Sequence, residues 1–315
     1  DKIAWYENTD GLGSFSSQKI ISISTNADGA RSVFAGDLDG DGDLDVLSAS
    51  SFADKIAWYE NTDGAGSFGP QQVITTNADG VQFVFAGDLD GDGDLDVLSA
   101  SDAPTIFSND DQIAWYENTD GAGSFGPQQV ITTDADGALS VFAGDLDGDG
   151  DLDVLSASLN DDKIAWYENT DGAGSFGPQQ VITTGANGAQ SVFAGDLDGD
   201  GDLDVLSASG NDDKIAWYEN TDGLGAFGNE RIVNSISNLS SNNVFSGDID
   251  VDGDEDIIAI ASDSMIVAYE NNGDGTFGEQ QLLVISSKLL DNSGISGSFA
   301  VADLNGDEAP EIIFF

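Results

Sequence analysis

The sequence has no histidine and no cysteine among its 315 residues. Without cysteine there is no disulfide framework and no thiol chemistry. Without histidine, the commonest general acid–base group and the commonest transition-metal ligand are both absent. These two absences exclude many enzyme classes and most transition-metal sites.

Positive charge is almost as scarce. Eight Lys and Arg stand against 59 Asp and Glu, which gives a formal net charge of −51. Nucleic-acid binding needs a basic face that displaces counterions, and an anionic membrane surface attracts basic segments, so neither partner is expected. No apolar run approaches the ~18 residues that cross a bilayer, so we expect no membrane insertion.

What the sequence has instead is enough apolar and aromatic material for a core. Hydrophobic residues make up 39% of the chain, with 17 Phe, 6 Tyr and 5 Trp. A disordered acidic tail contains few aromatic residues. We therefore expect a folded, acidic protein.

Two phrases recur along the whole chain, and internal repeats decide the fold before any other signal. The first reads VFAGDLDGDGDLDVLSAS at residues 33–50, and the second reads IAWYENTDG at residues 56–64. Each occurs six times, with the last copies degraded. The acidic loop of the first phrase begins at intervals of 51 to 57 residues, at Asp37, Asp88, Asp145, Asp196, Asp248 and Asp303.

One repeat predicts four strands. These are SVFAG, LDVLSAS, KIAWYEN and FGPQQVITT, with Asp-Gly and Gly-rich turns between them. No segment keeps a 3.6-residue apolar period, so the fold class is all-β. Six four-stranded units favour a β-propeller as a single domain over residues 1–315. The predicted blades are residues 30–80, 81–137, 138–188, 189–240, 241–295, and a composite of 296–315 with 1–29.

The two ends of the sequence predict how the ring closes. The chain starts at the third strand of a unit and stops at the second strand of another. Pairing of N-terminal strands 3 and 4 with C-terminal strands 1 and 2 would complete a sixth blade and remove two sheet edges. The alternative is an arbitrary piece of a longer array.

The acidic loop has the pattern of a calcium site. In the first copy, DLDGDGDLD (residues 37–45), Asp occupies positions 1, 3, 5, 7 and 9, and Gly occupies position 6. Carboxylates this close repel one another unless a cation holds them. Calcium prefers hard oxygen ligands in a flexible loop, with a backbone carbonyl at position 7, whereas magnesium demands a tighter octahedron.

Five loops carry this pattern in full and a sixth is degenerate, with Glu308 in place of the position-6 glycine. The alternative is a merely solvated acidic turn. The predicted metal ligands are Asp37, Asp39, Asp41, Asp43 and Asp45; Asp88, Asp90, Asp92, Asp94 and Asp96; Asp145, Asp147, Asp149, Asp151 and Asp153; Asp196, Asp198, Asp200, Asp202 and Asp204; Asp248, Asp250, Asp252, Asp254 and Asp256; and Asp303, Asn305, Asp307 and Glu311.

These residues resemble the FG-GAP, or VCBS, repeat. The resemblance rests on D-x-D-x-D-G-x-x-D, the preceding FxxGD and the Phe-Gly after the turn, and it covers essentially the whole chain. It implies a β-propeller with calcium in the first hairpin loop of each blade, as in the integrin α-subunit propeller and many secreted bacterial proteins. The chain differs from the integrin propeller in having six copies instead of seven.

Differences among the copies gather on the face opposite the calcium loops. The connection between the second and third strands is longest at residues 102–112, where Ile106 and Phe107 are apolar. Apolar residues on a loop predict ligand contacts. The alternative is that they fold back onto their own blade.

A second set of residues has two interpretations. Each third strand carries a Trp two residues before a Glu, and an aromatic ring beside a carboxylate can hold a sugar. The alternative is that the ring packs between neighbouring blades. The predicted contact residues of this set are Trp58, Trp115, Trp166 and Trp217.

Taken together, these observations favour a non-enzymatic, calcium-binding module of a secreted or cell-surface protein. Its expected partner is a glycan or protein ligand on the face opposite the calcium loops, and we expect a monomeric domain, as part of a larger surface protein or alone. One alternative is a passive spacer. Another is a polysaccharide lyase or hydrolase, which needs a single unrepeated acid–base site that the sequence does not show.

Overall fold

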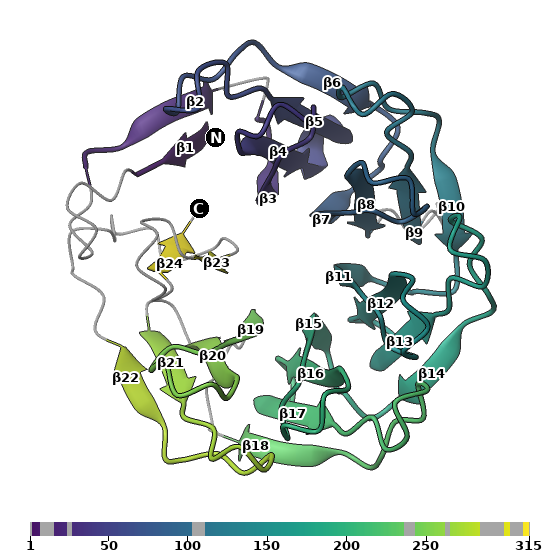
Figure 1. Cartoon of the computed structure of the whole chain (residues 1–315), viewed down its shortest axis with the longest axis vertical. Helices are drawn as coiled ribbons and strands as arrows, with labels where there is room; N and C mark the ends of the chain where they lie inside the picture. The colour runs from purple at the N-terminus through teal and green to yellow at the C-terminus, as the bar shows by residue number, and fades with distance from the viewer. Residues whose placement is uncertain are drawn as a thin grey trace.

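The computed structural model describes residues 2–6, 16–23, 27–102, 111–235, 243–261, 265–283, 299–302 and 311–314. Its strands form five four-stranded and two two-stranded antiparallel sheets. The sheets stand around a common axis like the blades of a propeller (Figure 1). The all-β prediction is therefore confirmed for the described residues, in which no helix is long and apolar enough to span a membrane.

Each four-stranded sheet is built from consecutive strands of one repeat. The sheets are β3 (Ala30–Gly36), β4 (Asp45–Ser50), β5 (Lys55–Tyr59) and β6 (Gln72–Thr75); β7 (Val81–Gly87), β8 (Asp96–Ser101), β9 (Gln112–Tyr116) and β10 (Gln129–Thr132); β11 (Ala138–Gly144), β12 (Asp153–Ser158), β13 (Lys163–Tyr167) and β14 (Gln180–Thr183); β15 (Ala189–Gly195), β16 (Asp204–Ser209), β17 (Lys214–Tyr218) and β18 (Arg231–Ser235); and β19 (Val244–Gly247), β20 (Asp256–Ala261), β21 (Met265–Tyr269) and β22 (Gln281–Leu283).

The remaining strands lie in one sector of the ring (Figure 1). β1 (Lys2–Trp5) pairs with β2 (Lys19–Ile23), and β23 (Phe299–Ala302) pairs with β24 (Glu311–Phe314). These are the N-terminal and C-terminal pairs from which a composite blade was predicted. Among the described residues, no strand of one pair is hydrogen-bonded to a strand of the other, so the two pairs form two separate sheets.

The predicted fourth strand is shorter than its sequence pattern suggests. In the first full blade it begins at Gln72, because Pro70 has no N–H for the ladder and Phe68 makes only an isolated bridge with Asn61. A register shift between Val73 and Thr75 then interrupts the pairing. Bulges of this kind twist an outer strand and protect its free edge from pairing with another chain.

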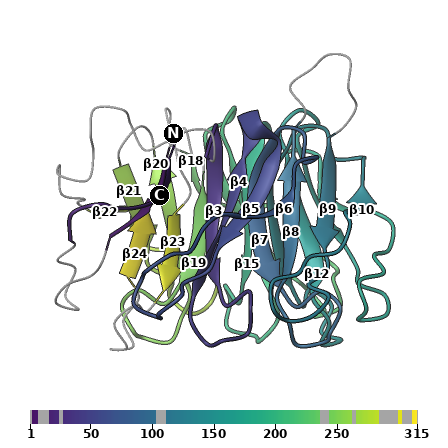
Figure 2. The same cartoon turned by 90° about the horizontal axis from the view of Figure 1, so that it is seen from above.

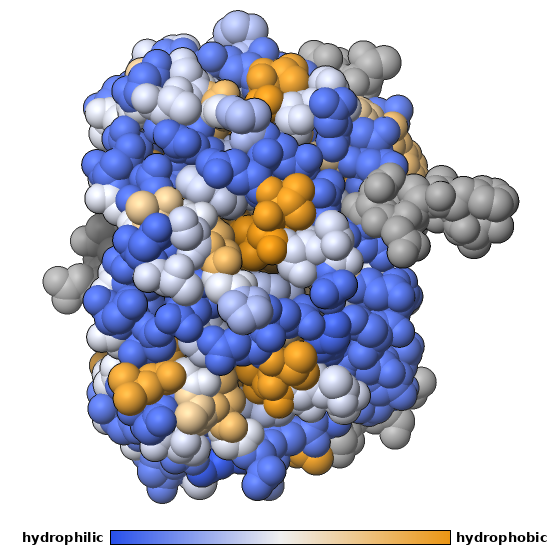
Figure 3. Space-filling model, turned by 90° about the vertical axis from the view of Figure 1, so that its right-hand side faces the viewer, coloured by the Kyte–Doolittle hydropathy of each residue, from blue (hydrophilic) through white to orange (hydrophobic). Residues whose placement is uncertain are grey.

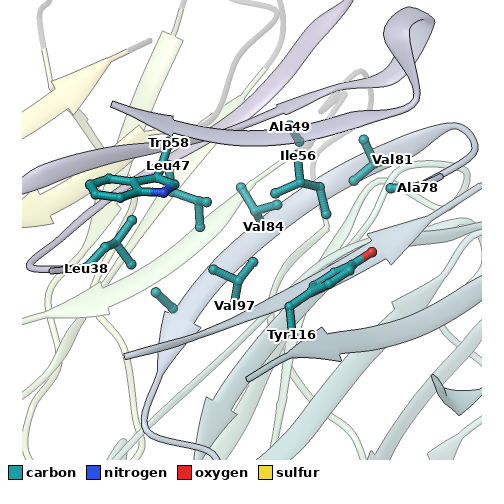
Figure 4. Packing of buried hydrophobic residues seen from close by; sticks show 11 residues of the cluster. Leu38, Leu47, Ala49, Ile56, Trp58, Ala78, Val81, Val84, Val97 and Tyr116 are labelled. Atoms are coloured by element: carbon teal, nitrogen blue, oxygen red, sulfur yellow. The ribbon is translucent and has the colours of Figure 1, made fainter. Parts of the chain in front are cut away.

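The core lies between blades. Between the first two full blades, Leu47, Ile56 and Trp58 pack against Val84 and Val97 of the next sheet (Figure 4). Equivalent clusters join the following blades. Alternate residues of the second and third strands face the two neighbouring blades, so these strands are buried on both sides.

Two opposite faces of the ring carry the connections (Figure 2). Since neighbouring strands are antiparallel, the loops between first and second strands share one face with the turns between third and fourth strands. We call this the loop face. The connections between second and third strands, including the 3-10 helix η2 (Ser51–Ala53), lie on the opposite face.

The side of the outer rim that Figure 3 shows is mostly hydrophilic, with separate hydrophobic patches. The exposed apolar side chains of the fourth strands share one position in the five four-stranded sheets, and they are Val73, Val130, Val181, Ile232 and Leu282. Ile20 of β2 holds the matching position of its repeat and is also exposed. Single exposed apolar residues of this kind are ordinary on protein surfaces and do not form one continuous apolar surface.

Candidate metal centres

The five acidic loops are wrapped around their first carboxylate. Oδ1 of Asp37 accepts hydrogen bonds from the N–H groups of Gly40 (2.8 Å) and Asp41 (3.1 Å), and Oδ2 accepts one from Gly42 (3.0 Å). The first carboxylates of the other loops accept bonds from the same region, and they are Asp88, Asp145, Asp196 and Asp248. Position 1 therefore sets the curvature of the loop.

The carboxylate at position 9 connects each loop to the rest of its blade. Oδ2 of Asp45 accepts the N–H of Leu38 at 3.0 Å, and Oδ1 accepts the N–H of Asn61, beyond the third strand, at 2.8 Å. The same two bonds occur in the other four loops. This side chain is almost completely buried in all five blades.

Burial has a clear electrostatic effect on position 9. The pKa of Asp96, Asp153 and Asp204 is raised to about 7 and that of Asp45 to about 6. Desolvation is the largest cause and the neighbouring aspartates add to it, whereas the two backbone N–H groups act in the opposite direction. Burial also raises the pKa of Asp256. A cation in the loop would relieve this cost.

The structure brings three carboxylates of each loop together. One oxygen from each lies within 4.8 Å of the other two. The groups are Asp37, Asp39 and Asp41; Asp88, Asp90 and Asp96; Asp145, Asp147 and Asp153; Asp196, Asp198 and Asp204; and Asp248, Asp250 and Asp256.

Three positions differ from the predicted ligand set, and position 7 belongs to none of the three-carboxylate groups. Position 5 lies outside the three-carboxylate group in the second to fifth loops, and position 9 lies outside it in the first. Position 5 is exposed and accepts the N–H of position 7, as Asp92 does from Asp94 at 2.9 Å. The side chain at position 7 is half-buried against the turn of its own blade, since a Cβ built on Gly121 would lie 2.4 Å from Oδ2 of Asp94.

The residues fit a hard cation. Oδ1 of Asp39 and Oδ1 of Asp198, both at position 3, are buried without a hydrogen-bond donor. A buried carboxylate oxygen without a partner is costly, and a cation supplies that partner. Because all the donors are oxygens on a glycine-containing loop, the set suits calcium better than zinc or copper.

The sixth predicted loop lies outside the described residues at Asp303, Asn305 and Asp307, and only the backbone of Glu311 is described, as the first residue of β24. Ile106 and Phe107, the predicted contact residues of the long connection, also lie outside the described residues.

The tryptophan prediction is corrected by burial. Trp58, Trp115, Trp166 and Trp217 are 1–3% exposed, so they offer no ring face to a ligand. Each ring lies against a glycine of the next blade, as Trp58 does on Gly123, where an added Cβ would be 2.2 Å from the ring. The structure thus agrees with the alternative that these rings pack between blades.

The face opposite the loops contains an exposed aromatic residue that the sequence analysis did not select. Phe52, in η2, is 71% exposed, and the guanidinium carbon of Arg31 lies 5.8 Å from its ring centroid. Nε of Arg31 also donates to Oγ of Ser51 at 3.3 Å. The sequence signal that could have selected Phe52 is the segment SFAD at residues 51–54, because the next three blades have the polar segment NDD there.

The FG-GAP-like repeat matches six successive segments that together cover nearly the whole sequence: residues 1–48, 37–99, 105–156, 145–207, 196–259 and 248–314. The chain belongs to the FG-GAP-like repeat family. The predicted resemblance is therefore confirmed.

Among solved structures, this FG-GAP-like repeat protein is similar to a lectin from Agrocybe aegerita that recognises non-reducing terminal N-acetylglucosamine. The TM-score is 0.61 and the identity 21%, over 88% of this chain and 73% of the lectin. It is also similar to the Photorhabdus luminescens Tc holotoxin pore (TM-score 0.43, 17% identity, 87% of this chain, 12% of that chain). An exotype rhamnogalacturonan lyase matches with TM-score 0.45 and 14% identity over 81% of this chain and 50% of the enzyme. No curated protein sequence matches this chain.

The fifth loop contains a strained residue. Val251 occupies position 4 with φ +64°, where the other four loops have glycine at φ +74° to +78°. A left-handed backbone is unfavourable for a β-branched side chain. The side chain is 58% exposed, so it gains little from packing.

We predict that Val251→Gly stabilises the protein by about 1 kcal/mol, because the left-handed strain that it removes, about 1–2 kcal/mol, exceeds the destabilising unfolded-state entropy that glycine adds. Urea denaturation in excess chelator measures the change. Gly199→Val, the reverse change in the fourth loop, should destabilise, because Gly199 has φ +78° and lies close to Gly273 O. A lower stability of Val251→Gly would contradict the strain argument.

We also predict a pH dependence in the absence of metal. The raised pKa of the position-9 carboxyls means that the folded state holds more protons than the unfolded state between about pH 4 and pH 7. Stability in excess chelator should therefore fall as the pH rises through this window and level off above it.

Thermal melts at pH 4.5, 6 and 8 measure this effect. They are repeated at ~1 M NaCl, which screens repulsion between exposed carboxylates but not the cost of burial. A melting temperature that stays constant or rises across this range at high salt would show that burial of position 9 does not control stability.

Proposed function

We propose that this protein is a calcium-stabilised β-propeller that acts as a non-enzymatic, extracellular binding module for a glycan or protein ligand. The observation that carries the calcium part is the fivefold repetition of a three-carboxylate group, with a buried, partnerless oxygen at position 3 of two loops. Solvated acidic turns have no reason to bury carboxylates at the same place in every blade.

Each site would hold calcium through the carboxylates at positions 1, 3 and 9, with position 5 on the exposed side and the backbone carbonyl of position 7 as further oxygens. Bound calcium would supply positive charge that links the loop to the buried end of its blade. The sixth, degenerate loop would bind more weakly. Calcium loops of this type suit extracellular calcium concentrations, which supports a secreted or cell-surface location.

A closed ring of six blades, formed by residues 1–315 as a single domain, is part of the proposal. The β1–β2 and β23–β24 sheets occupy the same sector (Figure 1). Joining them into one composite blade would give this sector the same four strands as the others. It would also cover two sheet edges.

The face opposite the loops is the proposed ligand surface. Phe52 and Arg31 combine an exposed ring with one of the few cations of the chain, in a connection that differs between blades. The lectin with the same fold recognises a terminal N-acetylglucosamine, which favours a glycan as the first ligand class to test. Ile106 and Phe107, in the sequence between β8 and β9, stay predicted contact residues outside the described part of the chain.

An enzymatic function has less support. The buried carboxylates with raised pKa values recur in all five four-stranded sheets and accept backbone N–H bonds, whereas an active site is usually a single arrangement.

For the metal, we expect calorimetric titration of the metal-free protein to detect about five calcium ions and a higher melting temperature on saturation. Asp90→Asn, in the second loop, should remove one site. Asp120→Asn is the matched control, because it removes the same charge from an exposed turn of the same blade. Asp120 does not belong to any of the three-carboxylate groups. An unchanged melt between millimolar calcium and excess chelator would exclude calcium.

For the ligand, we expect binding to a terminal sugar on a glycan array in millimolar calcium, with loss of signal in chelator. Phe52→Ala should weaken binding about tenfold or more if the ring stacks on the sugar. Leu224→Ala is the control, because Leu224 is 69% exposed on the loop face. Absence of any glycan signal would favour a protein ligand or a passive spacer.

A further inference from the structure

The asparagine that follows each third strand is a buried polar residue outside the acidic loops. Asn118, Asn169 and Asn220 are 1% exposed. A buried amide needs hydrogen-bond partners, and those of this residue come from two different blades.

Within its own blade, Asn118 contacts the second acidic loop. Its backbone N–H donates to Oδ1 of Asp96 at 2.8 Å, and its side-chain Nδ2 lies 3.4 Å from the carbonyl oxygen of Leu95. Asn118 is thereby attached to positions 8 and 9 of that loop.

Across the blade interface, Asn118 contacts the first acidic loop. Nδ2 donates to the carbonyl oxygen of Leu38 at 3.0 Å. The same bond recurs around the ring, from Asn169 to Leu89 (2.8 Å), Asn220 to Leu146 (2.8 Å) and Asn271 to Leu197 (2.9 Å). Each asparagine therefore connects two consecutive loops.

Leu38, whose carbonyl oxygen Asn118 contacts, lies between two of the predicted metal ligands. Leu38 is position 2, between the carboxylates of positions 1 and 3. Its N–H donates to Asp45 of its own loop, and its side chain is 1% exposed in the cluster with Trp58 and Tyr116 (Figure 4). Its N–H belongs to the peptide group that joins Asp37 to Leu38, and its carbonyl, held by Asn118, belongs to the peptide group that joins Leu38 to Asp39. Both peptide groups that flank Leu38 are therefore fixed, and so are the directions in which the carboxylates of positions 1 and 3 leave the backbone.

A second contact places the next blade on the same loop. Gly40, at position 4, lies so close to the following turn that an added Cβ would be 3.0 Å from the carbonyl oxygen of Gly121. The turn that contains Gly121 also lies on Asp94 of its own loop. The turn after Asn118 is thus packed between two acidic loops.

We propose that Asn118, Asn169, Asn220 and Asn271 are positioning residues that link neighbouring calcium sites, so that calcium binding in one loop strengthens binding in the next. This inference rests on the proposed calcium function. Ordering of one loop orders the peptide that the asparagine holds, and the same asparagine then holds position 9 of the following loop. Energetic coupling between two sites is reciprocal, so the effect runs in both directions along the ring.

The test is a double-mutant cycle in calcium titrations of the full chain. Asp39→Asn disables the first loop, and its effect on the affinity of the remaining sites is measured with Asn118 present and with Asn118→Ala. We expect Asp39→Asn to weaken binding at the second loop about tenfold in the first background, and to have no such effect in the second.

Two comparisons separate positioning from other effects. Asn118→Asp keeps the shape and adds a negative charge, which alone would strengthen calcium binding; positioning predicts weaker binding, because two donated hydrogen bonds are lost. Thr119→Ala removes a hydrogen bond to Ser124 within the same turn and should leave the coupling unchanged. Asn220→Ala combined with Asp39→Asn is the distant control and should be additive.

Each outcome has a defined meaning. Equal effects of Asp39→Asn in both Asn118 backgrounds, with calcium still bound, would overturn the coupling alone. No calcium uptake by the unaltered protein would overturn the calcium function itself. If Asn118→Ala does not fold, the cycle is repeated with Asn169→Ala and Asp90→Asn, where the same bond joins the second and third loops.

Discussion

The buried aspartate at position 9 of each acidic loop is the interaction on which the rest of the blade depends. Its two oxygens bind the loop on one side and the end of the third strand on the other. Few buried charges are tolerated in proteins unless they are paired or bind a metal. Here the surrounding backbone N–H groups supply part of that compensation, and the neighbouring carboxylates create the demand for a cation.

The turn between the third and fourth strands also makes contacts between neighbouring blades. The turn that begins at the asparagine carries a glycine on which the tryptophan of the preceding blade lies, and another that approaches the preceding acidic loop. A side chain at Gly123 would meet the indole ring of Trp58, and one at Gly121 would meet the carboxylate of Asp94. The repeated TDG-x-G phrase is therefore a packing requirement of the ring as well as a turn signal.

Prediction from the sequence succeeded where the cause is local. Apolar segments bounded by Asp-Gly and Gly-rich turns sufficed for the strands, and the spacing of carboxylates sufficed for the loops. It was less accurate where the cause lies in a neighbouring strand or blade. The fourth strand begins late at Gln72, and Trp58 is buried by a glycine that is 65 residues away in the chain. Phe52 was missed because its exposure depends on how η2 sits on Gly29.

By itself, the sequence determined the repeat, which is visible as recurring phrases, and also the all-β class, the five acidic loops and their oxygen donors, because each strand and each loop depends on residues close together in the chain. Only the tertiary structure decided which oxygens converge, with position 9 in four loops and position 5 in the first. It also decided that the tryptophans are internal and that each loop is held by an asparagine of the next blade. These features depend on the packing of one repeat against its neighbour, which the pattern within a single repeat does not specify.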